Sequence, residues 1–171
     1  MSNVVVVIDT VRGFLEAGHA LYCGDEARAI IPCLRELLRG ETEKGSHILY
    51  LLDHHDPDDP EFQMFPPHSI KGTSEVEIIP ELAEFEGEII PKRHFNAFYD
   101  TALEQRLQEL QPDKVIVAGV CTDICVMYTV CGARDRGYVV EVPADCVATF
   151  DPEGHAFALK HMEKVLGAAI T

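Results

Sequence analysis

Apolar residues along this chain fall into two patterns that alternate from the N-terminus to the C-terminus. The first pattern is a short, unbroken apolar run, such as VVVVI, ILYLL and VIVA. Runs of this kind, rich in branched side chains, are typical of strands that are buried on both faces. They predict strands at residues 4–8, 48–52, 88–90, 115–118 and 139–142, with a short edge strand at 168–170.

The second pattern is a repeat of apolar side chains every three or four residues, which predicts amphipathic helices. These helices are expected at residues 26–39, 101–110, 123–136 and 152–166. The last one has clear ends, because Asp151 and Pro152 are typical of a helix start and Gly167 of a helix end. Strands that alternate with helices predict an α/β fold, a three-layer, doubly wound and mostly parallel sheet of about six strands with helices on both faces.

Length and composition fit a single domain spanning residues 1–171 and narrow the range of partners. The residues are 47% hydrophobic and 25% charged, an ordinary globular mixture, and the net charge is −15. This acidic balance argues against nucleic acid and anionic membranes as partners. The first residues show no basic, apolar leader, so we expect a cytoplasmic protein.

The six cysteines form no CxxC pair, which argues against a zinc ribbon or a thioredoxin-type motif. In a reducing cytoplasm we also expect no disulfide framework. Most of these cysteines, Cys146 included, are therefore predicted to be small buried apolar residues.

Polar residues follow the predicted strands at one edge of the sheet, where α/β proteins bind their ligands. Asp9, Asp53 and Lys92 each end a strand, and Cys125 would lie at the start of the next helix. A helix N-terminus and Lys92 would lower the thiol pKa of Cys125, and Asp9 could exchange a proton with it. The alternative is a plain ion pair between Asp9 and Lys92 beside a buried, inert thiol.

The long segment DHHDPDDPEFQMFPPH, residues 53–68, carries a second candidate site. Asp53 and His55 lie two apart on an extended chain and point the same way, whereas His54 points away. His68 returns after a Pro-Pro turn. One carboxylate and two imidazoles suit a catalytic zinc, manganese or iron ion with an open position. The alternative is a solvated acidic loop with incidental histidines.

Two segments, KRHFNAFYDTAL and VIVAGVCTDICVMYT, together with the strand-end Asp9, resemble the cysteine hydrolases of the isochorismatase-like superfamily over nearly the whole chain. The resemblance implies a catalytic triad of Asp9, Lys92 and Cys125. It also implies a cis peptide between Val120 and Cys121, with the backbone amides of Cys121 and Cys125 forming an oxyanion hole.

The pattern DxH…FPPHxxKGT is similar to the nicotinamidase (pyrazinamidase) branch. This implies a divalent metal, zinc first with manganese or iron as alternatives, and a homo-oligomer. It further implies hydrolysis of nicotinamide to nicotinate and ammonia through a cysteine thioester, in salvage for NAD synthesis. The implied metal ligands are Asp53, His55, His68 and, as in some relatives, Glu61. Phe14 and Phe65 could sandwich a flat ring, with Phe65 standing where the branch often has tryptophan.

Two other functions remain open at this point. Another amidase or carbamoyl hydrolase of the superfamily would use the same triad on a different small amide without this metal set. A receiver-like phosphorelay module would also gather acids and a lysine around a divalent ion. Its phosphoacceptor, however, should follow the third strand, where this chain has Lys92.

Overall fold

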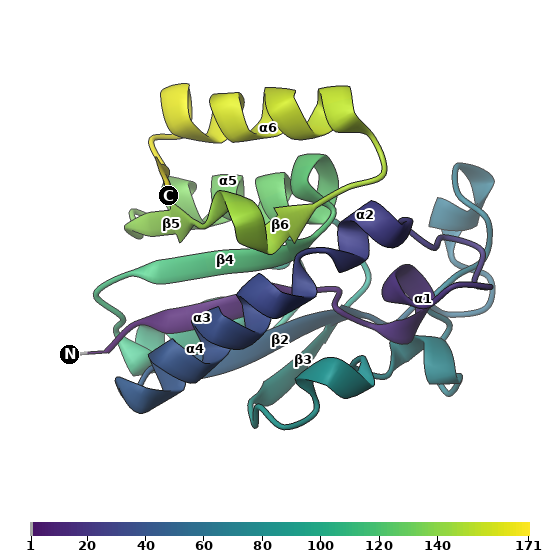
Figure 1. The fold of residues 1–171 in the computed structure, drawn as a ribbon, viewed down its shortest axis with the longest axis horizontal. Coiled ribbons are helices and arrows are strands. Elements are labelled where there is room, and N and C mark those ends of the chain that lie inside the picture. Colours follow the sequence, from purple (N-terminus) through teal and green to yellow (C-terminus); the bar gives the residue numbers. More distant parts are fainter. Residues whose placement is uncertain (1) are drawn as a thin grey trace.

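A computed structural model describes residues 2–171 and shows one parallel sheet. Its seven strands lie in the order β3-β2-β1-β4-β5-β7, and β6 pairs with β4 (Figure 1). The strands are β1 (Val4–Ile8), β2 (His47–Asp53), β3 (Glu88–Lys92), β4 (Val115–Val120), β5 (Val140–Val142), β6 (Val147–Ala148) and β7 (Ala169–Ile170). The predicted doubly wound α/β sheet is confirmed, with β6 as a strand that the sequence pattern did not reveal.

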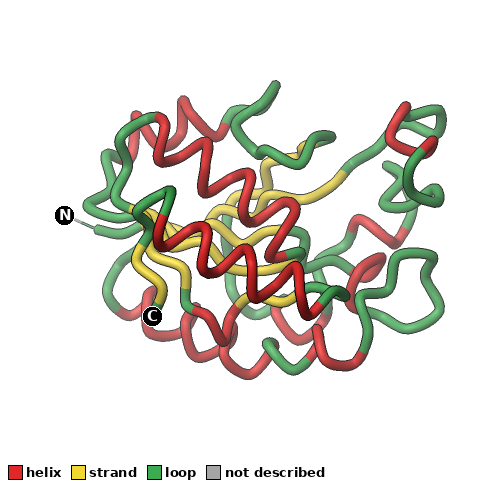
Figure 2. The backbone as a smooth tube through the Cα atoms, turned by 90° about the horizontal axis from the view of Figure 1, so that it is seen from above, coloured by secondary structure: helices red, strands yellow, loops and turns green. Residues whose placement is uncertain are grey.

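Helices cover both faces of the sheet (Figures 1 and 2). One face carries α1 (Arg12–Leu15), α2 (Asp25–Arg28) and α3 (Ile31–Glu43), and the other carries α4 (Leu103–Leu110), α5 (Met127–Asp135) and α6 (Pro152–Lys164). The alternation along β1 shows why. Val5 and Val7 belong to the core that includes Leu34, whereas Val6 belongs to the core that includes Leu107. Burying each such side chain stabilises the fold by roughly 1.5–3 kcal/mol.

Two predicted helices begin differently in the structure. The predicted helix at 26–39 is two helices, since α2 ends at Arg28 and α3 begins at Ile31 with a proline in its first turn. Pro32 has no backbone N–H to donate, and its ring would collide with the carbonyl of Arg28 in a continuous helix. The predicted helix at 123–136 opens as a π-helical turn, Thr122–Val126, before α5.

Cys33 and Cys146 form a disulfide with their Cα atoms 5.5 Å apart, so the expectation of no disulfide is wrong. Cys146 is therefore half of a disulfide and not simply the buried apolar residue that the sequence predicted. The bond joins α3 to the turn just before β6, across a sequence separation of 113 residues. Spacing along the chain could not reveal this pair, because the fold alone brings the two segments together.

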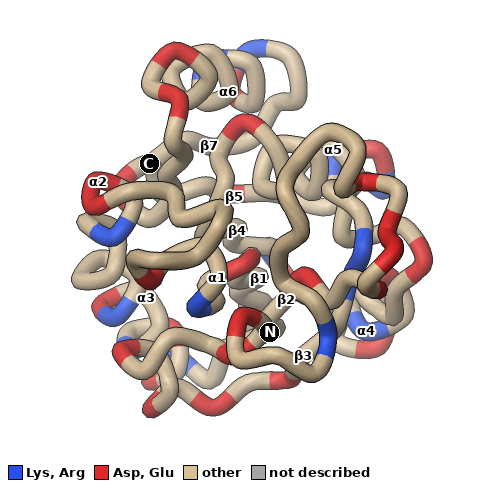
Figure 3. The backbone as a smooth tube through the Cα atoms, turned by 90° about the vertical axis from the view of Figure 1, so that its right-hand side faces the viewer, with Lys and Arg blue, Asp and Glu red and all other residues tan. Residues whose placement is uncertain are grey.

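Acidic residues are spread over many parts of the backbone and are not gathered in one region (Figure 3). Aspartate and glutamate number 29 against 14 lysines and arginines. Of the helices in residues 2–171, none combines the length and apolar character needed to cross a bilayer.

Candidate active site

The carboxyl ends of β1, β2 and β3 bring three predicted residues together. Asp53 and Lys92 are direct neighbours in the β2–β3 register. Asp9 follows β1, and its N–H donates to the carbonyl oxygen of Leu51 in β2. The register of parallel strands thus places the polar residue that ends each apolar run at one edge of the sheet.

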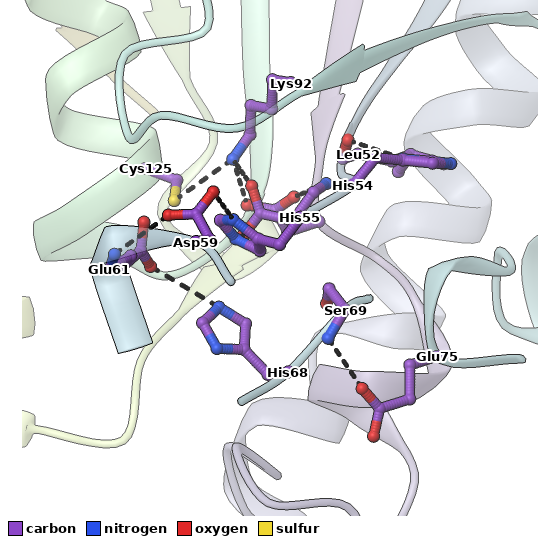
Figure 4. Close-up of polar contacts among 12 residues, drawn as sticks. Leu52, His54, His55, Asp59, Glu61, His68, Ser69, Glu75, Lys92 and Cys125 are labelled. Atoms are coloured by element: carbon purple, nitrogen blue, oxygen red, sulfur yellow. Dashed lines mark hydrogen bonds and ion pairs between the residues drawn. The ribbon is translucent and has the colours of Figure 1, made fainter. Parts of the chain in front are cut away.

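Lys92 lies at the centre of this group (Figure 4). Its Nζ atom is 2.9 Å from Oδ2 of Asp9, 2.5 Å from Oδ1 of Asp53 and 3.5 Å from Sγ of Cys125. The backbone N–H of Asp53 donates to Oδ1 of Asp9 at 2.9 Å. All four side chains are buried, so their charges interact with little screening by water.

These contacts determine which groups carry protons. Burial and the neighbouring Asp53 raise the pKa of Asp9 to about 6, against the opposing effect of Lys92. Burial alone would lower the pKa of Lys92, but Asp53 and Asp9 hold it well above its usual value. Lys92 is therefore a permanent cation, and Asp9 is mostly ionised at neutral pH while still able to accept a proton.

Cys125 does not have the lowered pKa expected from the sequence. Burial, Asp9 and Asp53 raise the pKa of its thiol well above the usual value, and together they outweigh Lys92. The expectation failed because it counted the cation and omitted desolvation and the second carboxylate. The resting residue is a neutral thiol that needs a base to become a nucleophile.

The turn that carries Cys125 follows β4 directly. The Val120–Cys121 peptide is cis, as the resemblance implies. The carbonyl oxygen of Cys121 accepts hydrogen bonds from the N–H groups of Ile124 and Val126, both at 3.1 Å. These bonds close the turn around Cys125.

Helix α6 braces the same turn from outside. Oγ1 of Thr122 lies 2.9 Å from Nδ1 of His155, in the first part of α6. His155 thus has a partner that the sequence did not indicate.

The long loop after β2 folds back on itself and brings the predicted metal ligands together. The N–H of His55 donates to the carbonyl oxygen of Ser69 at 2.9 Å, and Lys71 donates to the carbonyl oxygen of His55 at 3.0 Å. Ser69 has a positive φ of 44°, and its N–H donates to Oε2 of Glu75 at 2.7 Å. The backbone hydrogen bonds between His55 and residues 69 and 71 place His68 beside His55, with ring centroids 4.7 Å apart.

The donor atoms fit a divalent ion. One ligand atom each of Asp53, His55 and His68 lies within 4.8 Å of the others, and all three residues are buried. Nε2 of His55 has no hydrogen-bond partner in residues 2–171, and it faces Oδ2 of Asp53 at 3.5 Å. Glu61 approaches from the 3₁₀ turn Pro60–Gln63, with Oε1 at 3.5 Å from Nε2 of His68. Buried nitrogen and oxygen donors around an unpaired imidazole nitrogen suit zinc, manganese or iron.

The protonation states of these residues follow from their burial and neighbours. Burial would lower the pKa of His55, but Asp53 and Asp59 raise it to about 9. Burial raises the pKa of Glu61 to about 7 and lowers that of His68. A cation bound at Nε2 of His55 would replace the proton on that nitrogen, because a ligating imidazole nitrogen must be deprotonated.

One pocket joins the two groups of residues. Asp9, Cys121 and Cys125 line one part of it, and Asp53, Glu61 and His68 line another. The remaining wall is apolar and consists of Phe14, Leu21, Phe65, Phe95, Val120, Ile124 and Phe150. The expected ring-binding residues Phe14 and Phe65 both lie here, each with an edge contact to His68.

Sequence reasoning missed part of this wall. Phe95 lies three residues after Lys92 and contacts Phe65 edge to face, with ring centroids 6.3 Å apart. Its place after a strand-end residue was the available signal. Phe150 and Leu21 reach the pocket from distant loops, and no sequence pattern marked them. His54 turns away, as expected, with Nδ1 at 3.1 Å from the carbonyl oxygen of Leu52 (Figure 4).

Comparison with known proteins identifies the family. Residues 3–171 match the isochorismatase domain family. The chain belongs to the isochorismatase family. An uncharacterised isochorismatase family protein of Bacillus subtilis is 34% identical, covering 99% of both chains. Membership confirms the superfamily resemblance and removes the phosphorelay module from consideration.

Solved structures of this family superpose closely on the chain. A pyrazinamidase/nicotinamidase from Streptococcus mutans has a TM-score of 0.94 and 37% identity, covering 99% of this chain and 100% of that one. A pyrazinamidase of Pyrococcus horikoshii in complex with zinc has a TM-score of 0.91 and 29% identity, covering 100% and 99%. Both relatives therefore share the full extent of this fold.

Proposed function

We propose that this protein is a nicotinamidase, which hydrolyses nicotinamide to nicotinate and ammonia through a thioester on Cys125. The observation that supports the proposal is the pocket lined by Cys125 and Asp9 on one side and by Asp53, Glu61 and His68 on the other. Lys92 contacts both Cys125 and Asp9 from behind this lining. The similarity to the Streptococcus mutans pyrazinamidase/nicotinamidase and to the Pyrococcus horikoshii pyrazinamidase supports the substrate class.

The first chemical step forms the carbon–sulfur bond. Asp9 takes the proton of the Cys125 thiol, and the resulting thiolate pairs with the ammonium of Lys92 at 3.5 Å. The thiolate attacks the carboxamide carbon, and the carbonyl electron pair moves onto oxygen. The backbone amides of Cys121 and Cys125 hold this oxyanion, and such a donor typically contributes about 100- to 1,000-fold in rate.

The second step breaks the carbon–nitrogen bond and releases the products. Asp9 returns its proton to the leaving nitrogen, so ammonia departs and a thioester remains. Asp9 then accepts a proton from water as the water attacks the thioester carbon. Collapse of that intermediate expels the Cys125 thiolate, which recovers the proton from Asp9, and releases the carboxylic acid, which gives its proton to solvent and becomes nicotinate.

The donors Asp53, His55, Glu61 and His68 would hold one divalent ion, with zinc as the first candidate. Such an ion would supply a Lewis acid to which the ring nitrogen of the substrate could bind. The chain itself contributes the orientation, because Phe14 and Phe65 line the apolar wall on which a flat ring can stack. A role in nicotinamide salvage for NAD synthesis, a cytoplasmic location and a homo-oligomeric state remain predictions.

The direct test is ammonia release from nicotinamide by the purified protein, with and without a chelator. We expect the wild-type protein to release ammonia and the Cys125→Ala variant to release none. The wild-type activity should fall when the chelator is added and return when zinc is restored. Pyrazinamide and an N-carbamoyl amine complete the substrate panel. Turnover of the N-carbamoyl amine alone, unaffected by the chelator, would assign the protein to the carbamoyl hydrolases instead.

A further inference from the structure

The imidazole ring of His55 lies between two carboxylates, one at each ring nitrogen. Nε2 faces Oδ2 of Asp53 at 3.5 Å. Nδ1 lies 3.1 Å from Oδ2 of Asp59 (Figure 4). The His55 side chain is fully buried, and Asp59 is 11% exposed. The Asp59 contact therefore lies almost entirely out of water, where a hydrogen bond to a carboxylate is strong.

The second oxygen of Asp59 contacts the segment that carries another donor. Oδ1 accepts a hydrogen bond from the N–H of Glu61 at 2.9 Å and so caps the 3₁₀ turn Pro60–Gln63. Glu61 in turn faces His68, with Oε1 at 3.5 Å from Nε2. One side chain thus contacts His55 directly and fixes the start of the turn that presents Glu61.

Asp59 is not placed to bind the same ion. His55, Asp59 and Glu61 also bring one ligand atom each within 4.8 Å of one another. The two nitrogens of an imidazole, however, point to opposite sides of the ring, and Nε2 of His55 faces Asp53 whereas Nδ1 faces Asp59. An ion bound to Nε2 beside Asp53 therefore lies across the ring from Asp59. Phe62 fills the space beside this group, with its ring centroid 5.5 Å from both histidine rings. Asp59 therefore contacts His55 at the ring nitrogen that does not face Asp53.

We propose that Asp59 is a positioning residue for the metal site, an inference that rests on the proposed function. Its Oδ2 holds the Nδ1 proton of His55, so that Nε2, which faces Asp53, is the nitrogen that gives up its proton and binds the ion. Its Oδ1 holds the turn that brings Glu61 to the same space. Carboxylate partners of this kind fix the tautomer and ring orientation of metal-binding histidines.

The test measures zinc affinity of the full-length, metal-free protein by competition with a fluorescent chelator. Asp59→Ala removes both contacts and is expected to weaken zinc binding about 10- to 100-fold. Asp58→Ala is the matched control, because Asp58 is exposed in the same loop and its loss changes the net charge equally. We expect the control to stay within about 2-fold of the wild type, since an exposed charge acts weakly through water.

A serine at this position separates the two contacts of Asp59. Asp59→Ser keeps an oxygen that can cap the turn but is too short to reach Nδ1 of His55. We expect zinc binding by this variant to be weakened nearly as much as by Asp59→Ala. Wild-type affinity in Asp59→Ser, with a loss only in Asp59→Ala, would reduce Asp59 to a turn cap and overturn the role at His55. The serine variant also serves as the test if the alanine variant does not fold.

The same titration distinguishes failure of this inference from failure of the metal site itself. If the wild-type protein binds no zinc, manganese or iron, the proposed metal site is wrong and Asp59 has no ion to position. If the wild type binds zinc and Asp59→Ala binds it equally well, the metal site stands and only the role of Asp59 is wrong. Thermal unfolding of the metal-free variants confirms that each comparison uses folded protein.

Discussion

The Nζ atom of Lys92 lies 3.5 Å from the Sγ atom of Cys125, and both side chains are buried. This cation does not ionise the thiol by itself, because Asp9 and Asp53 surround the same ammonium and desolvation opposes a charged sulfur. A thiolate becomes favourable when Asp9 accepts the thiol proton. The negative charge of the Asp9 carboxylate is then lost, and the negative charge of the thiolate takes its place beside Lys92. The nucleophile is thus formed during the reaction, and the resting protein stores a neutral thiol.

Replacing Cys125 with alanine should abolish ammonia release from nicotinamide, because the other thiol that lines the pocket, Cys121, has its Sγ atom against Sγ of Cys23 at 3.6 Å, whereas Sγ of Cys125 lies beside Lys92. The matched control is Cys131→Ala, a half-buried cysteine on α5 that does not line the pocket. Its turnover should match the wild type. Ammonia release by Cys125→Ala above the uncatalysed rate would remove Cys125 from the mechanism.

Asp9→Asn should lower kcat by about 100- to 10,000-fold, the usual contribution of a general acid–base group. The substitution keeps an oxygen that can accept the N–H of Asp53, now bound by Oδ1 of Asp9 at 2.9 Å, and Lys92 retains Asp53 as a partner. We therefore expect the variant to fold and to bind substrate. Steady-state kinetics and a denaturant titration check both points, and an unchanged kcat would assign the proton transfers to another group.

Much of the site was predictable because parallel strands end at a common edge. The apolar runs predicted the strands, and the polar residues that follow them, Asp9, Asp53 and Lys92, lie together as this rule requires. The pairing of Asp53 with His55 also followed from the two-residue period of extended chain. Local sequence carries this information, because each of these residues belongs to a regular element or directly follows one.

Features that depend on tertiary packing were not predictable. The pKa of Cys125 reflects how many charges converge around Lys92 and how completely water is excluded. Strand β6 is two residues long and exists because β4 offers it a partner. Asp59 sits in an acidic run that looks solvated, and only the folded loop turns one of its members toward His55.

The disulfide between Cys33 and Cys146 should stabilise the oxidised protein. It closes a loop of 113 residues, and cross-links of this kind typically add about 2–4 kcal/mol, chiefly by restricting the unfolded chain. Denaturant unfolding with and without a reductant should show this difference, and Cys33→Ser should be insensitive to the reductant. Thiol titration of the unfolded protein should find four reactive thiols without reductant, the free cysteines 23, 121, 125 and 131. Six thiols would show that the bond does not form.

Glu41 should make stability fall in strong acid. Burial by itself would raise its pKa, but hydrogen bonds from Lys44, Ser46 and Asn3 lower it to about 2 from the ordinary 4.5. A carboxyl group whose pKa is lowered by folding stabilises the folded state at any pH above its pKa in the unfolded chain. For Glu41 this contribution to the free energy of unfolding is about 2–3 kcal/mol, and it is lost as the pH falls from about 4.5 to about 2. Glu41→Gln should therefore be less stable than the wild type at pH 7, with a difference that shrinks over this window.

The control for Glu41 is Glu43→Gln, because Glu43 is exposed on the same helix. Its unfolding midpoint should follow that of the wild type at every pH. Denaturant titrations between pH 7 and pH 2 measure both variants. If the wild type and Glu41→Gln lost stability equally as the pH fell, a group other than Glu41 would be responsible for the acid sensitivity.

Gly119 should tolerate no side chain, because β4 passes directly against β1 at this point. A Cβ atom there would lie 2.1 Å from the carbonyl oxygen of Ile8, and the residue has a positive φ of 115°, which L-residues rarely adopt. Gly119→Ala should cost more than about 4 kcal/mol or prevent folding, since neither backbone can move without breaking the β1–β4 ladder, whose last pair is Ile8 and Gly119.

Gly40→Ala is the matched control, because Gly40 lies in α3 with no atom within 4 Å of its added methyl group. That change should stabilise the protein by about 0.5–1 kcal/mol. Denaturant unfolding of both variants measures the contrast, and equal midpoints for Gly119→Ala and the wild type would mean that β1 and β4 lie farther apart here than the structure has them.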